Sequence, residues 1–131
     1  MIRPRPPIDP PLGPAPAPPV RLIALGDERA GDDGAALRAA RQLAQQDPHL
    51  QVVLARRPGL ALLELLDPEV PTVIADVVCL AGAAGNLVET ALADVPYAAL
   101  EGRRRGAHGD GAAPALRAAR ALGRRLPPGI F

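Results

Sequence analysis

A short apolar run, an acidic glycine-containing turn and a helical pattern follow one another directly in this chain. They occupy residues 20–25, 26–34 and 35–44, respectively. A buried strand that passes through such a turn into a helix is the unit from which α/β proteins are built. Ligands of these proteins bind at the carboxyl ends of the strands, so the turn is where we expect chemistry.

The same alternation of strand-like and helix-like segments continues to the end of the chain. The order β-α-β-α-β-β-loop-α predicts an α/β fold, a three-layer sandwich in which a mostly parallel twisted sheet of four to five strands carries helices on both faces. The further predicted strands cover residues 50–55, 72–78 and 86–92, and the further predicted helices cover residues 60–66 and 112–122.

The two ends of the chain are expected to behave differently from its middle. Residues 1–19 contain nine prolines and few large apolar side chains, which predicts a disordered proline-rich tail before a single domain at 20–131. Arg3 and Arg5 precede no apolar stretch typical of a secretory signal, and no run is long enough to span a membrane. We therefore expect a cytoplasmic protein.

Several residue types are absent or rare, and this excludes whole classes of chemistry. The chain has no lysine and no serine, which excludes Schiff-base chemistry, a P-loop lysine and serine-nucleophile hydrolases. The net charge of +1 gives no reason to expect a nucleic acid or an anionic membrane as a partner. The single cysteine, Cys79, has no nearby base in sequence and is more typical of a buried structural thiol than of a nucleophile.

Two aspartates are candidate site residues. Asp33 lies in the first turn of a predicted helix, where it is either a simple helix cap together with Asp32 or part of a site. Asp76 lies within the apolar run 73–78, where an unpaired buried carboxylate costs several kcal/mol. Asp76 therefore needs a partner, a metal ion or a position at the strand end, and we favour a role at a site.

His108 is the third candidate. It lies between small residues in the loop before the last predicted helix. It is either a solvated loop histidine or a ligand whose small neighbours allow the bound group to approach closely. His49, after Asp47-Pro48, is expected to be solvated. Two carboxylates and one histidine suit a borderline divalent metal ion with open coordination positions.

A dinucleotide site is the rival interpretation of the turn at 26–34. The glycines of the turn do not give the G-x-G-x-x-G pattern, and its four acidic residues repel a pyrophosphate. The turn therefore favours a metal ion over a nucleotide.

Three motifs together resemble those of the hydrogenase maturation proteases, the endopeptidases that trim the large subunit of [NiFe]-hydrogenases. The first is the turn 26–34 with its helix, and the second is the run 73–78 followed by a glycine-containing turn and Asn86-Leu87-Val88. The third is Ala107-His108-Gly109, followed by a Leu/Ala/Arg helix and Leu126-Pro127-Pro128. The resemblance covers residues 20–131.

This resemblance implies an α/β fold of the phosphorylase/hydrolase-like type and a peptidase, grouped with the aspartic-type endopeptidases. Its activity would be to remove a C-terminal extension from a nickel-loaded large-subunit precursor. It implies that Asp33, Asp76 and His108 contact the nickel and form the catalytic site. The nickel is carried by the substrate, and no tightly bound cofactor is expected. The implied partner is that precursor, with the protein itself a monomer or a weak dimer.

Departures from the family pattern leave an alternative open. The chain has Asp27 where relatives usually have Asn, Arg29 where they often have Leu, and Arg56-Arg57-Pro58-Gly59 where they often have a Gly-Thr-rich loop. Relatives also continue past the Pro-Pro-Gly at 127–129 with a further strand, so we expect the sheet to lack its last strand. The alternative function is a non-catalytic homologue that binds the precursor or a divalent metal ion without cleavage.

Overall fold

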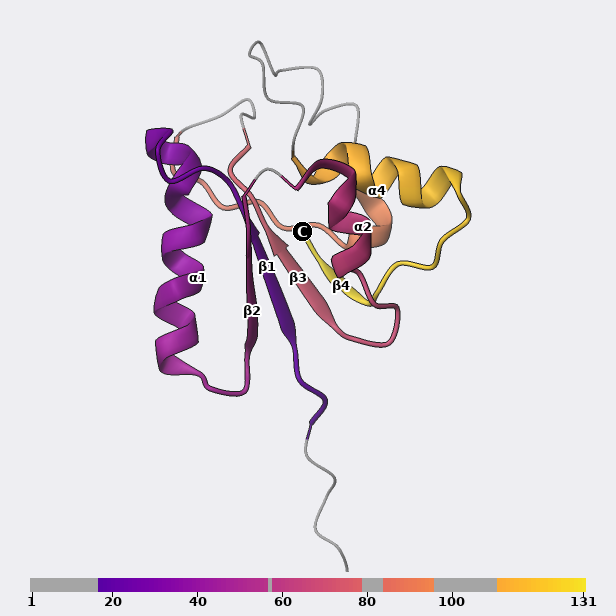
Figure 1. The fold of residues 1–131 in the computed structure, drawn as a ribbon, viewed down its shortest axis with the longest axis horizontal. Coiled ribbons are helices and arrows are strands. Elements are labelled where there is room, and N and C mark those ends of the chain that lie inside the picture. Colours follow the sequence, from indigo (N-terminus) through magenta and orange to yellow (C-terminus); the bar gives the residue numbers. More distant parts are fainter. Residues whose placement is uncertain (1–16, 57, 79–83, 96–110) are drawn as a thin grey trace, which may run out of the picture.

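The computed structural model describes residues 17–131 except 57, 79–83 and 96–110. Within these residues, four strands form one parallel sheet in the order β2-β1-β3-β4 (Figure 1). The predicted α/β class and parallel sheet are therefore confirmed. The strands are β1 (Arg21–Leu25), β2 (Gln51–Ala55), β3 (Thr72–Ala75) and β4 (Gly129–Ile130).

Helices cover both faces of the sheet, as expected for a sandwich of three layers. In Figure 1, α1 lies on one side of the strands, and α2 and α4 lie on the other. The three predicted helices are thus present, each with slightly shifted ends. The α-helices are α1 (Ala35–Gln46), α2 (Leu62–Leu65) and α4 (Ala112–Ala121), and the 3-10 helices are η1 (Gly31–Gly34), η2 (Gly59–Ala61) and η3 (Leu92–Asp94).

The alternating side chains of β1 divide the core into two parts. Ile23 and Leu25 point to the face that packs against α2 and α4, where Leu116 is fully buried. Leu22 and Ala24 point to the opposite face, and they pack against Leu37 and Ala40 of α1. This period-two pattern fixes the register of β1, because a shift by one residue would exchange the two faces.

The predicted strand at 86–92 is wrong. Leu87 is 93% exposed and Val88 is 59% exposed, so the first part of this β-prone stretch does not pack on the sheet. The edge of β3 is occupied instead by β4, a strand of two residues that forms where the sheet was expected to lack its last strand. The end of the stretch does contact the rest of the fold: Thr90 exchanges two backbone hydrogen bonds with Phe131, and Ala91 forms an isolated antiparallel bridge with Ile130. Leu92, in η3, is buried in the core.

The sequence pattern also predicts that Asp32 caps the first helix and that Leu43 and Leu122 lie on the inner faces of their helices, and all three predictions are wrong. Asp32 is exposed and makes no side-chain cap, because a 3-10 turn at 31–34 precedes α1 and places Gly34 at the cap position. Leu122 is 70% exposed because α4 ends at Ala121. Leu43 is 43% exposed, since its flank of α1 extends beyond the small cluster that α1 forms with the sheet.

The expected proline-rich tail lies almost entirely outside the described residues, and residues 17–20 are exposed and without regular structure. No helix in the described part of the chain has the length and apolar character that crossing a membrane requires.

Candidate functional site

The acidic turn after β1 folds back onto the end of that strand. Gly26 has φ +140°, a region that favours glycine, and a Cβ atom at this position would lie 1.9 Å from the backbone oxygen of Asp33. The Asp33 side chain completes the contact, since its Oδ2 accepts a hydrogen bond of 2.8 Å from the Asp27 backbone N–H. The half-buried Asp33 carboxylate is therefore held at the carboxyl end of β1.

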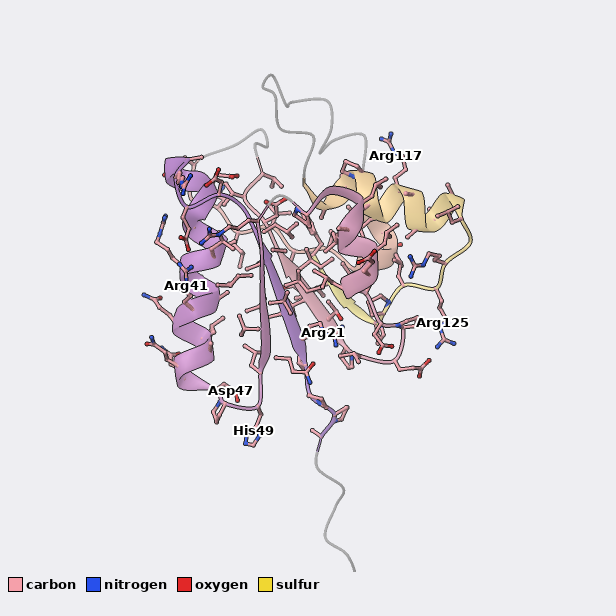
Figure 2. The ribbon with its side chains drawn as sticks, in the orientation of Figure 1. Arg21, Arg41, Asp47, His49, Arg117 and Arg125 are labelled. Atoms are coloured by element: carbon pink, nitrogen blue, oxygen red, sulfur yellow. The ribbon has the colours of Figure 1, made fainter. Side chains whose placement is uncertain are left out.

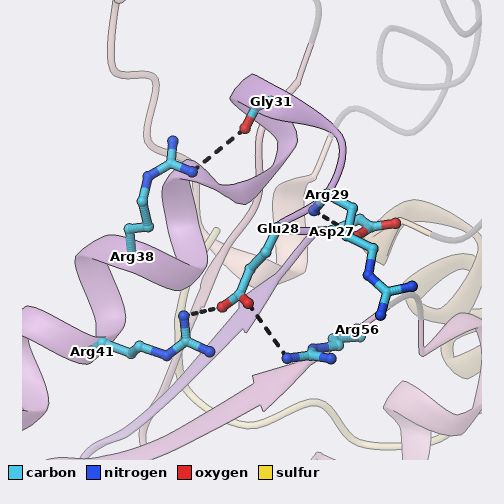
Figure 3. Close-up of polar contacts among 7 residues, drawn as sticks. All are labelled: Asp27, Glu28, Arg29, Gly31, Arg38, Arg41 and Arg56. Atoms are coloured by element: carbon cyan, nitrogen blue, oxygen red, sulfur yellow. Dashed lines mark hydrogen bonds and ion pairs between the residues drawn. The ribbon is translucent and has the colours of Figure 1, made fainter.

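Arginines from two other elements hold the same turn. Glu28 forms an ion pair with Arg41 of α1 and a second one, at 3.4 Å, with Arg56, which directly follows β2 (Figure 3). Arg38 of α1 also reaches the Gly31 carbonyl oxygen at 3.5 Å, the limit of a hydrogen bond. The turn that carries Asp33 is thus tied to α1, which follows it in sequence, and to the end of β2, the strand paired with β1.

These arginines were not among the residues predicted from the sequence. Arg38 and Arg41 fall on the outer face of the helical pattern at 35–44, which predicts only exposure to solvent, and both are exposed. The usable signal was their spacing of three residues, which places both on one helix face close to an acidic turn. The contact of Arg56 with Glu28 could not be read from spacing, since it depends on the pairing of β2 with β1.

Asp76 lies at the same edge of the sheet. Strand β3 ends at Ala75, shorter than the predicted 72–78, so Asp76 follows the strand and is half-buried rather than enclosed within it. The β1–β3 register pairs Ala24 with Ala75, which places Asp76 beside the end of β1. Its Oδ1 accepts a hydrogen bond of 2.8 Å from the Val77 backbone N–H. Position at a strand end thus relieves the desolvation cost anticipated for this carboxylate.

The remaining predicted site residue, His108, lies outside the described residues, as do Cys79 and Asp110. Helix α4, which follows His108 in sequence, begins at the end of the molecule toward which the strands point (Figure 1). His49 is exposed at the opposite end, beside Asp47, as predicted (Figure 2).

The structure therefore places two of the three predicted ligands, Asp33 and Asp76, after neighbouring strands at one edge of the sheet. Among the described residues, no group of three or more His, Cys, Asp or Glu side chains could hold a metal ion. Two carboxylates alone leave most coordination positions of a divalent ion open.

Comparisons of the chain with models of protein families, with curated proteins and with solved structures found no match. An assignment of function therefore depends on the residues of this chain and on their positions in the fold.

Proposed function

We propose that this protein is an endopeptidase of the hydrogenase maturation type, which removes a C-terminal extension from a nickel-loaded [NiFe]-hydrogenase large-subunit precursor. The observation that supports the proposal best is the position of Asp33 and Asp76. These two carboxylates follow neighbouring parallel strands and lie at the edge where α/β sheets bind their ligands.

Each carboxylate is held by a backbone N–H, which orients it before the substrate arrives. Asp33 accepts from the Asp27 N–H, and Asp76 accepts from the Val77 N–H. Oriented carboxylates bind a divalent ion without first losing rotational freedom. In the proposed reaction, Asp33 and Asp76 contact the nickel in the substrate, together with His108.

This arrangement explains how cleavage could depend on metal insertion. Two carboxylates at the same edge of the sheet attract a cation, and the nickel in the precursor supplies one. A precursor without nickel offers no such cation and binds poorly. A bound divalent ion can polarise a peptide carbonyl or activate a water molecule, and either would assist hydrolysis.

The decisive experiment is a cleavage assay. The purified protein is incubated with a large-subunit precursor that retains its C-terminal extension, with and without Ni(II), and loss of the extension is measured by mass spectrometry. We expect cleavage of the nickel-loaded precursor only. Asp33→Asn and Asp76→Asn should each abolish it, because an amide is a weaker ligand and carries no charge.

Asp32→Asn is the matched control, since Asp32 is the exposed neighbour of Asp33. It should leave cleavage unchanged. Full cleavage by the Asp76→Asn variant would refute the assignment of the site. Binding of the nickel-loaded precursor without any mass loss would identify the protein as a non-cleaving homologue instead.

A further inference from the structure

A second, chemically different site lies at the other end of β3. A hollow of about 510 Å³ is bounded by the end of α4, the loop before β3, helix η3 and the segment that leads into β4. Pro128 in its wall accepts a hydrogen bond of 2.9 Å from the N–H of Thr72, the first residue of β3. Asp76 follows the last residue of that strand, so the hollow is separate from the acidic edge. The lining residues are Pro68, Ala93, Arg120, Arg124, Arg125, Leu126, Pro127 and Pro128.

The charged part of the lining is made of arginine. Arg124 contacts the Leu63 carbonyl oxygen at 3.5 Å, a neutral partner that leaves its positive charge in place. Arg125 pairs with Glu69, but both side chains are more than 70% exposed, so water and salt weaken the pair. A guanidinium carries five N–H donors, more than these contacts use. The hollow therefore presents cationic donors to an incoming group.

The remaining walls are apolar and rigid, because they are made largely of proline and leucine. A small inorganic anion could use the arginines but would gain nothing from Pro68, Leu126 or Pro127. A peptide that carries both carboxylates and apolar side chains would use both parts of the lining, because arginine forms bidentate contacts with carboxylates. Apolar side chains of the same peptide would cover the proline walls.

We propose that this hollow binds an acidic, partly apolar peptide segment of a partner protein. The proposal is independent of the proteolytic function proposed above. The amino-terminal tail of the chain itself fits poorly, since residues 1–16 contain two arginines and one aspartate. The partner is therefore recognised by charge opposite to that of the hollow.

Fluorescence anisotropy with the full chain tests this proposal. The probe is a short fluorescein-labelled peptide that alternates glutamate and leucine, and its glutamine–leucine counterpart is the neutral control. We expect saturable binding of the acidic peptide that weakens as salt is added. The double variant R124Q/R125Q should bind it about tenfold more weakly.

Arg117→Gln is the matched control, because Arg117 is exposed on α4 but outside the lining, and it points away from Arg125 (Figure 2). It should change affinity by less than about twofold. Glu69→Gln should tighten binding, because it removes the carboxylate that competes for Arg125. Misfolding cannot tighten binding. The Glu69→Gln variant therefore tests the arginine contacts even if R124Q/R125Q loses its structure.

Several outcomes would overturn the proposal. They are no saturable binding of the acidic peptide, equal binding of the neutral peptide, and affinity unchanged in R124Q/R125Q. Inorganic phosphate that competes as well as the peptide would define a simple anion site. Self-association in sedimentation that R124Q/R125Q abolishes would assign the hollow to a second copy of the chain.

Discussion

The acidic turn at 26–34 and the arginine hollow both concentrate charge at the surface, but the fold holds them in opposite ways. In the turn, the backbone of Gly26 contacts that of Asp33, and arginines from two elements pair with Glu28. At the hollow, Arg124 and Arg125 are exposed side chains beyond the end of α4. Changes in the turn should therefore affect folding, whereas changes of charge at the hollow should affect mainly binding.

The largest effect is expected from Gly26→Ala. The new Cβ would lie 1.9 Å from the Asp33 backbone oxygen, and φ +140° is unfavourable for alanine. The backbone of the turn must shift, so we expect a loss of roughly 3 kcal/mol or more in the free energy of unfolding. Urea denaturation followed by circular dichroism measures it.

Gly31→Ala is the control for backbone strain alone. Gly31 also has positive φ, +60°, but no atom lies within 4 Å of its added Cβ. Its cost should be about 1 kcal/mol. Equal losses in the two variants would show that the close approach of Gly26 to Asp33 adds nothing to the cost of the substitution.

An effect of comparable size or smaller is expected where α4, the helix that precedes the hollow, packs on the sheet. Leu116 is fully buried against the core, so Leu116→Ala should cost about 2–5 kcal/mol, with a value near the lower end if the site collapses. Leu122, 70% exposed just past the end of α4, is the control, and Leu122→Ala should change stability by less than about 0.5 kcal/mol. Thermal unfolding of both variants provides the measurement, and a comparable loss at Leu122 would contradict the observed end of α4.

The comparison of the two regions also shows what could be predicted from the sequence. The turn, its strand and its helix are contiguous, so local patterns were enough to place Asp33 in the turn after the first strand. They also singled out Asp76, but the predicted strand 72–78 ran past it, whereas β3 ends at Ala75. The stretch 86–92 has the local pattern of a strand, yet β4 takes the place beside β3 through contacts distant in sequence. The strand propensity of one segment cannot show that a different segment of the chain pairs with β3 instead.

The same reasoning explains why neither the ion pairs of Glu28 nor the hollow was predicted. Glu28 meets Arg56 across 28 positions, and the hollow joins Pro68 to the 124–128 segment. Both depend on which strands become neighbours in the sheet. The arginines themselves are evident in the sequence, but their partners are not.

The smallest expected effect compares one ion pair from each region. Within the described part of the chain, Glu28 pairs with two arginines and its side chain is 30% exposed, whereas Glu69 pairs with Arg125 and its side chain is 77% exposed. Glu28→Gln should therefore cost about 1 kcal/mol at low salt, and Glu69→Gln should cost less than about 0.5 kcal/mol. Urea denaturation at low and high salt measures both, and the Glu28 effect should shrink as salt is added. Equal costs would mean that the two arginines hold the acidic turn no more firmly than a single exposed pair holds the rim of the hollow.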